Sequence, residues 1–293
     1  MAGISAPPYF EMADLTFIRR SAWLPYPIVP SPNRPKLGQH FLTDSRYRRR
    51  IVDALDLCPD DLVIEIGAGR GAMTDLLAGR ARQVVAIELD RALSARLREN
   101  FWGEPRLEIV QGDILATDIE AICRRYHSDR CFVFGNLPYY ITSPILERMR
   151  THRRSIRAMA LLVQREVADR IVAGPGSRDY GFLSVFVQLF SKPRLLFAVP
   201  PGAFSPPPQV HSALVEFQIE PSRLHWTKEA QDLFLNFVKR CFARKRKNLL
   251  NNLAGMAARA KLEVVLKELN LPATVRAEEM TIEQFAALHA RIA

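Results

Sequence analysis

The sequence predicts an α/β protein: a largely parallel sheet with helices on both faces, followed by a small all-helical domain. Between residues 62 and 173, short apolar runs rich in β-branched residues alternate with amphipathic stretches, and this repetition is typical of parallel strands joined by crossover helices. From about residue 226 onward, apolar residues recur only at helical spacing. The 293 residues are enough for one large domain and one smaller domain, each with its own core.

Each predicted strand is a short apolar run. The runs are LVIEI (62–66), VVAIE (84–88), LEIV (107–110), CFVFG (131–135) and MALLV (159–163), and the accompanying helices are expected at 72–80, 91–101, 118–126, 143–150 and 165–173. Two more strands, LLFAV (195–199) and ALVEFQI (213–219), have a connection short enough for an antiparallel hairpin at the sheet edge.

The first 33 residues differ from the rest, because prolines interrupt any helix or ladder. These are Pro7, Pro8, Pro25, Pro27, Pro30 and Pro32. We therefore expect a partly disordered extension at 1–33, a sheet domain at 34–222 and a helical domain at 223–293.

Charge gives the first indication of a partner. The 41 Lys and Arg residues exceed the 31 Asp and Glu residues, and the net charge of +10 suits a polyanion, although many proteins are simply basic. No apolar run approaches the roughly 18 residues of a membrane span, and the amino terminus lacks the apolar core of a secretory signal. We expect a cytoplasmic protein, because the cysteines form neither a zinc pattern nor a disulfide framework: Cys58, Cys123, Cys131 and Cys241.

A glycine-rich turn follows the first predicted strand. Gly67 and Gly69 let the backbone approach a ligand closely, and Glu88 at the end of the next strand can accept hydrogen bonds from two ribose hydroxyls. A dinucleotide-binding domain has a similar pair, although the spacing here is GxGxG and not GxGxxG. At the end of the third strand, Asp113 can accept the amine of an adenine ring while Ile114 packs on the ring. Together these strand ends resemble the cofactor site of class I S-adenosylmethionine-dependent methyltransferases, which have a Rossmann-like fold.

The fourth strand leads into Asn136-Leu137-Pro138-Tyr139, which resembles a signature of amino methyltransferases. An adenine N6 is a poor nucleophile, because its lone pair is delocalised into the ring. The Asn136 oxygen and a backbone carbonyl near Leu137 or Pro138 can accept its two N–H groups and direct the nitrogen toward the methyl donor. Tyr139 offers a ring on which the base can stack. The alternative is an ordinary turn with the tyrosine in the core.

Several segments together resemble one family, the rRNA adenine N6,N6-dimethyltransferases. They are KLGQHFL (36–42), NLPYYITSPIL (136–146), LLVQREVADRIVA (161–173), YGFLSV (180–185) and FSPPPQVHSALV (204–215), and the resemblance covers about residues 34–293. It implies S-adenosylmethionine as cofactor, and we expect no metal, because proton loss relieves the positive charge on the methylated nitrogen. It also implies that Phe204 is a second aromatic wall for the target base. The cofactor pocket implied by the resemblance includes Gln39, His40, Leu42, Gly67, Gly69, Glu88, Leu89, Asp113, Ile114 and Asn136; many relatives have Asn where His40 stands.

The helical domain carries consecutive basic residues, Arg244, Lys245, Arg246 and Lys247. They would project from more than one face of a helix, so we expect contacts with rRNA phosphates and not a simple solvated stripe. By the same resemblance, the substrate is two adjacent adenosines near the 3′ end of 16S rRNA in the assembling 30S subunit, each dimethylated. We expect a monomer, since no separate dimerisation segment is evident.

Dimethylation leaves only one N–H on the amine after the first transfer. We hypothesise that Tyr139 and Phe204 hold the ring by stacking while the amine rotates. The alternatives are the related enzyme that dimethylates 23S rRNA, a DNA adenine methyltransferase, and a non-catalytic ribosome-assembly factor on the same scaffold. The FSPPPQVHSA segment favours the small-subunit enzyme over the first, and the presence of Glu88, Asp113 and Asn136 favours activity over the last.

Overall fold

The computed structural model describes residues 40–138, 141–220 and 226–292. All of these belong to one compact unit of the chain, Lys36–Ala293. The predicted extension at 1–33 and the predicted boundary between residues 222 and 223 lie outside the described residues. No described helix is both long enough and apolar enough to cross a membrane.

The described residues form a seven-stranded sheet in the order β4-β3-β2-β5-β6-β9-β7. The strands that pair in parallel are β2 (Leu62–Ile66), β3 (Gln83–Glu88), β4 (Leu107–Gln111), β5 (Cys131–Asn136) and β6 (Ile156–Gln164). The remaining two, β9 (Ser212–Ile219) and the edge strand β7 (Ser191–Val199), form an antiparallel pair, and β9 is also antiparallel to β6. The predicted fold class, its five parallel strands and the antiparallel pair at the edge are confirmed.

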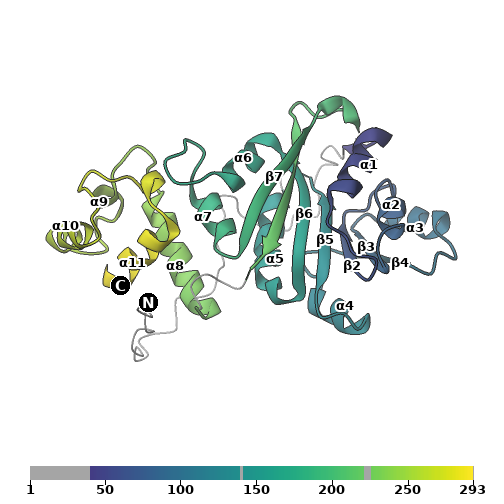
Figure 1. Ribbon diagram of the computed structural model, residues 1–293, viewed down its shortest axis with the longest axis horizontal. Coiled ribbons are helices and arrows are strands. Elements are labelled where there is room, and N and C mark those ends of the chain that lie inside the picture. The colour runs from purple at the N-terminus through teal and green to yellow at the C-terminus, as the bar shows by residue number, and fades with distance from the viewer. Residues whose placement is uncertain (1–39, 139–140, 221–225, 293) are drawn as a thin grey trace. The chain divides into compact units, whose positions relative to one another are not determined.

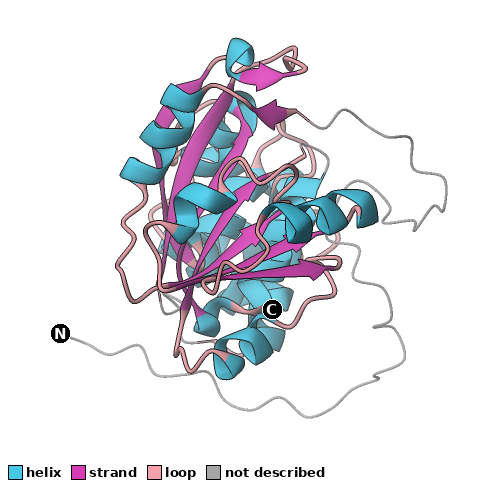
Figure 2. Ribbon diagram, turned by 90° about the vertical axis from the view of Figure 1, so that its right-hand side faces the viewer, coloured by secondary structure: helices cyan, strands magenta, loops and turns pink. Residues whose placement is uncertain are grey.

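Helices cover both faces of this sheet, which explains why the central strands are almost wholly apolar. Figure 1 shows α1 (Ser45–Ala54), α2 (Thr74–Ala78) and α3 (Arg91–Asn100) on one side and α5 (Thr142–Thr151), α6 (Arg165–Val172) and α7 (Phe182–Gln188) on the other. The remaining helix of this part, α4 (Ile119–Arg125), lies between β4 and β5 in the chain. Figure 2 shows the strands enclosed by helices in a view turned by 90°.

The core on the α1 side is formed by residues far apart in the sequence. Ile51 and Val52 of α1 and Leu77 of α2 pack in one cluster with Phe132 of β5 and Leu162 of β6, and all five are at most 4% exposed. Aspartates begin three of the helices: Asp44, Asp90 and Asp118 accept backbone N–H groups from the first turns of α1, α3 and α4. These caps fix where each helix starts after its strand.

Two features of the sheet domain were not predicted. One is α7, whose YGFLSV segment is almost wholly apolar and therefore has no polar face to reveal a helix. The other is a small second sheet in which β1 (Phe41–Leu42) pairs with β8 (Phe204–Ser205). These strands have two residues each and are more than 160 residues apart, so no local pattern reveals their pairing.

After residue 226 the described chain is helical, as predicted. It contains α8 (Lys228–Cys241), α9 (Leu249–Asn252), α10 (Arg259–Glu268) and α11 (Ile282–Ile292). Phe234, Phe237 and Cys241 of α8 are buried, as is Phe285 of α11, and the rings of Phe234 and Phe237 contact His289 of α11.

A buried arginine connects the helical part to the sheet domain. The Arg150 side chain of α5 is 2% exposed, and its Nη2 donates to Glu147 on the same helix at 2.8 Å and to Asp232 of α8 at 2.7 Å. Its Nη1 donates to the Gln231 side chain at 3.3 Å. A backbone hydrogen bond makes a second connection, in which the N–H of Gly176 donates to the carbonyl of Glu278 at 2.7 Å.

Candidate active site

A cavity of about 410 Å³ lies at the carboxyl ends of the parallel strands. Its walls come from the turn after β2, from the ends of β3, β4 and β5, and from the small β1–β8 sheet. The strand order changes direction between β2 and β5, and ligands of open α/β sheets bind at such a position. The cavity is therefore where the fold places a ligand.

The turn after β2 requires glycine. Gly67 and Gly69 have φ angles of +71° and +58°, a region that L side chains rarely adopt. The N–H of Gly67 donates to the carbonyl of Ile87 at 2.8 Å, which ties the turn to the end of β3. A Cβ atom on Gly69 would stand 3.1 Å from Cε1 of Phe41, so the backbone is also close to the opposite wall.

Two acids stand at neighbouring strand ends, as predicted. Glu88 is 4% exposed, and its carboxylate accepts the N–H groups of Gly69 at 2.8 Å and of Asp90 at 2.9 Å. Asp113 is exposed, and its Oδ1 accepts the N–H of Leu115 at 2.9 Å. These backbone bonds hold both carboxylates on the cavity wall, one buried beside the glycine turn and one at the solvent side.

A third acid in the cavity, Glu65, was not singled out from the sequence. It is 2% exposed, and the Thr74 hydroxyl donates to its Oε2 at 2.6 Å. Burial raises the pKa of Glu65 to about 7; the Thr74 hydrogen bond opposes this shift, and the nearby charge of Glu88 adds to it. The available signal was a carboxylate inside the otherwise apolar run LVIEI.

The acceptor side of the cavity is built on Asn136, the last residue of β5. Its Nδ2 donates to the backbone carbonyl of His40 at 3.3 Å. This bond orients the side-chain amide, so that Oδ1 is the atom turned away from His40. The next residue, Leu137, donates its N–H to the carbonyl of Leu162 at 3.3 Å and is 3% exposed. Asn136 is thus held by the backbone of His40, and Leu137 by the backbone of Leu162 in β6.

Gly135 makes this arrangement possible. A Cβ atom at residue 135 would lie 2.7 Å from Cδ2 of Leu137 and 3.3 Å from Cβ of Ile66. Because residue 135 has no Cβ, the Leu137 side chain can pack directly against the backbone of β5. The glycine is therefore part of the site, although it contributes no side chain.

The β1–β8 sheet supplies the wall facing Asn136. Leu42 pairs with Phe204 in its register, and both side chains line the cavity at 2% and 5% exposure. The N–H of Thr43 donates to the carbonyl of Ala203 at 2.9 Å, and His40 Nδ1 donates to the carbonyl of Pro206 at 2.7 Å. The structure therefore brings the KLGQHFL and FSPPPQVHSALV segments together at the site.

Every predicted pocket residue that the structure describes lines the cavity. These residues are His40, Leu42, Gly67, Gly69, Glu88, Leu89, Asp113, Ile114, Asn136, Leu137, Pro138 and Phe204. Gln39 and Tyr139 lie outside the described residues. Phe41, which the resemblance also placed in the pocket, lines it as well, whereas sequence reasoning missed Glu65, Arg70, Met73, Ile141 and Ile145. Within the described part of the chain, no group of three His, Cys, Asp or Glu side chains could hold a metal ion.

The basic residues 244–247 are exposed, but the prediction that they lie on a helix is wrong. α8 ends at Cys241, and the four residues form turns before α9. The buried Asn252 side chain stabilises this connection, because its Nδ2 donates to the carbonyls of Cys241 (2.7 Å), Arg244 (3.2 Å) and Lys247 (3.4 Å). Arginine and lysine favour helices, so their sequence alone does not predict the break. Lys245 Nζ also donates to the carbonyl of Arg178 at 2.6 Å.

The chain matches known proteins over nearly all of its length. The family model "Ribosomal RNA adenine dimethylase" matches residues 31–293. The chain is 44% identical over 261 residues to ribosomal RNA small subunit methyltransferase A of Acidobacterium capsulatum, covering 89% of this chain and 91% of that protein. It is 42% identical over 266 residues to the protein of the same name from Koribacter versatilis, covering 87% and 93%.

Solved structures agree in fold. A dimethyladenosine transferase from Plasmodium falciparum superposes with a TM-score of 0.73 at 25% identity, covering 85% of this chain and 96% of that chain. The 23S rRNA methyltransferase ErmE superposes with a TM-score of 0.67 at 27% identity, covering 86% and 99%. The chain therefore belongs to the ribosomal RNA adenine dimethylase family and is an S-adenosylmethionine-dependent methyltransferase.

Proposed function

We propose that this protein transfers methyl groups from S-adenosylmethionine to N6 of two adjacent adenosines near the 3′ end of 16S rRNA, dimethylating each during small-subunit biogenesis. The observation that carries the proposal is the position of Asn136, which lines the same cavity as Glu88 and Asp113 and has its amide oriented by His40. The small-subunit methyltransferases that are 44% and 42% identical to the chain support 16S over 23S rRNA.

The cavity fits the proposed cofactor. Its volume of about 410 Å³ lies in the range of small-molecule sites. The carboxylate of Glu88 would accept ribose hydroxyls and that of Asp113 the adenine amine, while Leu89 and Ile114 would pack against the adenosine. Leu89 is 60% exposed although it is apolar, as expected of a side chain that a ligand covers. When bound, S-adenosylmethionine supplies a methyl group on a positively charged sulfur.

The acceptor side would direct the target amine. Asn136 Oδ1 accepts one N6–H, and the backbone carbonyl of Leu137 accepts the other. The carbonyl of Pro138 already accepts the N–H of Ile141 at 3.1 Å, which favours Leu137 for this role. Two acceptors turn the nitrogen lone pair toward the methyl group, and the proton released after transfer passes to solvent.

Phe204 would hold the base through the second transfer. Its ring belongs to the β1–β8 wall and is packed in the core that includes Leu42, so its position does not depend on the substrate. The stacking role of Tyr139 stays a prediction, since that residue lies outside the described residues. With the ring held by stacking, the monomethylated amine can rotate and keep one hydrogen bond.

The exposed residues 244–247 would bind the rRNA at a place outside the cavity. All four are proposed as phosphate ligands. Arg244 and Lys245 also donate to the carbonyls of Asn251 at 3.4 Å and of Arg178 at 2.6 Å, so these two would contribute less. The proposed organisation is an extension at 1–33, a methyltransferase domain at 34–222 and an rRNA-binding helical domain at 223–293. We further propose that the protein acts as a cytoplasmic monomer on the 30S subunit or its precursor, without a metal.

The test is to map the methylated nucleotides. The protein would be incubated with labelled S-adenosylmethionine and undermethylated 30S subunits, 50S subunits or duplex DNA. We expect N6,N6-dimethyladenosine at two adjacent positions near the 3′ end of 16S rRNA. Label confined to 23S rRNA or to DNA would refute the substrate, and absence of label in all three would favour a non-catalytic assembly factor.

A further inference from the structure

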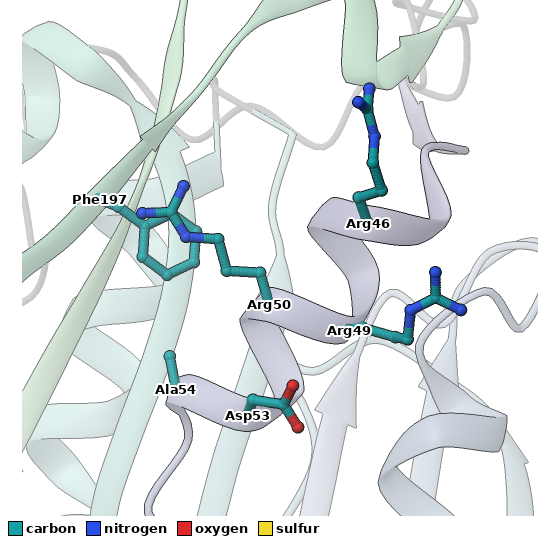
Figure 3. A pocket seen from close by; sticks show the side chains of 6 residues that line it. All are labelled: Arg46, Arg49, Arg50, Asp53, Ala54 and Phe197. Carbon is teal, nitrogen blue, oxygen red and sulfur yellow. The ribbon is translucent and has the colours of Figure 1, made fainter.

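A second hollow of about 590 Å³ lies on α1, outside the cavity described above. It is lined by Arg46, Arg49, Arg50 and Asp53 of α1 together with Phe197 of β7. Figure 3 shows the Arg50 side chain extending across the Phe197 ring, while Arg46 and Arg49 leave the helix in other directions. The Arg50 guanidinium carbon stands 4.0 Å from the ring centroid. Stacking restricts this guanidinium without using its N–H donors.

The charge of this surface is not balanced by its own acids. Asp53 is paired with Arg80 at 2.6 Å, and Asp44 is paired with Arg46 at 2.8 Å. Within the described part of the chain, Arg49 and Arg50 are in no ion pair. The three arginines that line the hollow, together with Arg80, outnumber Asp44 and Asp53 and leave a net charge of +2. The two guanidinium groups without an ion pair, those of Arg49 and Arg50, are adjacent in the sequence.

The charges of the α1 arginines are compensated only at the start of the helix. The first turn of α1 contains no acidic residue, but the N-cap Asp44 accepts the N–H of Arg46 and pairs with its guanidinium at 2.8 Å. Arg46 and Arg50 are four residues apart, where like charges repel. The opposite face of the helix is anchored by Ile51 and Val52 in the core. Arg49 and Arg50 have no acidic partner among the described residues, so their charge is available on the exposed face of the helix.

The hollow is connected to the acceptor wall. Leu42 lines the cavity, and the next two residues, Thr43 and Asp44, both donate their N–H groups to Ala203, the residue before Phe204. α1 begins at Ser45, and Arg50 follows five residues later, about 8 Å along the helix axis. The arginines therefore lie on the helix that begins three residues after Leu42 of the cavity wall.

We propose that the arginine hollow binds phosphodiester groups of the rRNA strand that flanks the target adenosines. This rests on the proposed function and assigns it a second phosphate contact, carried by the catalytic domain and separate from residues 244–247. Arg49 and Arg50 donate N–H groups to phosphate oxygens, and Phe197 fixes the plane of Arg50. The surface does not touch the reacting atoms, so it contributes to binding and not to the methyl transfer.

The test measures rRNA binding at several salt concentrations. The variant Arg49→Gln/Arg50→Gln removes both free charges, and Arg49→Lys/Arg50→Lys keeps them. The control, Arg96→Gln/Arg98→Gln, removes two exposed arginines from α3, which contributes no residue to the hollow. Filter binding to undermethylated 30S subunits gives Kd and its dependence on KCl. Calorimetry with S-adenosylmethionine and thermal unfolding show whether the cavity and the fold are intact.

We expect the glutamine pair to bind 30S subunits about tenfold more weakly at 0.15 M salt, and to lower the slope of log Kd against log salt by about 1.4. The lysine pair and the α3 control should keep the wild-type slope. The KM for subunits should rise while kcat and cofactor affinity stay unchanged. A wild-type slope in the glutamine pair, or an equal loss in the α3 control, overturns the proposal. Failure of the proposed function would appear differently, as wild-type protein that binds subunits but forms no dimethyladenosine.

Discussion

Replacing Glu65 by glutamine should remove a pH dependence from the stability of this protein. Glu65 is buried in the cofactor cavity beside Thr74, and its pKa is raised from 4.5 to about 7, chiefly by burial. Because the pKa of the folded state is the higher one, the folded protein binds the proton more tightly than the unfolded chain between these values. The stabilisation is complete below about pH 4.5 and is lost as the pH rises through about 7.

The size of the effect follows from the two pKa values. A shift from 4.5 to about 7 corresponds to about 3 kcal/mol in the free energy of unfolding. Glutamine has nearly the same shape, can still accept the Thr74 hydroxyl and does not ionise. The stability of Glu65→Gln relative to wild type should therefore increase by up to about 3 kcal/mol between pH 5 and pH 8.5.

Urea unfolding of both proteins at half-unit pH steps measures this difference. Glu166→Gln is a matched control, because Glu166 is 72% exposed and should show a change below about 0.5 kcal/mol at every pH. Thr74→Val removes the bond that lowers the Glu65 pKa, so it should move the transition to higher pH. A difference between Glu65→Gln and wild type that does not change from pH 5 to pH 8.5 would refute the reasoning.

Three other substitutions test separate parts of the structure. Gly135→Ala places a Cβ 2.7 Å from Leu137 and should destabilise by about 1–3 kcal/mol in urea unfolding, whereas Gly174→Ala, with nothing within 4 Å, should not; equal effects would argue against the tight packing. Asp113→Ala should weaken S-adenosylmethionine binding about tenfold in calorimetry through loss of one hydrogen bond, and an unchanged Kd would exclude its role. Arg150→Met removes the ion pairs to Glu147 and Asp232 and should cost about 2–3 kcal/mol; a loss no larger than that of exposed Arg154→Met would contradict a connecting role.

The sequence predicts the sheet well, because its strands are continuous apolar runs and each acid or glycine of the cofactor side follows one of them. Glu88 and Asp113 could be placed at strand ends from this register alone. The same logic predicted the antiparallel edge, because the connection between the last two strands is short. The local sequence pattern was sufficient to place a site residue wherever that residue directly follows or ends a predicted strand.

Other parts depend on contacts between distant residues. Leu42 and Phe204 meet only because two-residue strands pair across the chain, and Asn136 is oriented by a carbonyl 96 residues away. The turn at residues 244–247 depends on Asn252, whose amide bonds three carbonyls. No helix or strand pattern encodes these bonds. Glu65 was missed for the opposite reason, since its strand was predicted and the acid within it was taken as part of the run.

The most direct test of this account is the rate at which Asn136→Ala forms N6,N6-dimethyladenosine on undermethylated 30S subunits, measured together with its affinity for S-adenosylmethionine. If Asn136 directs the target amine, the rate at saturating cofactor should fall about 100-fold or more, while the cofactor Kd changes less than tenfold. A wild-type rate, or a loss that disappears when cofactor is saturating, would contradict the assignment of Asn136 as the residue between cofactor and adenine.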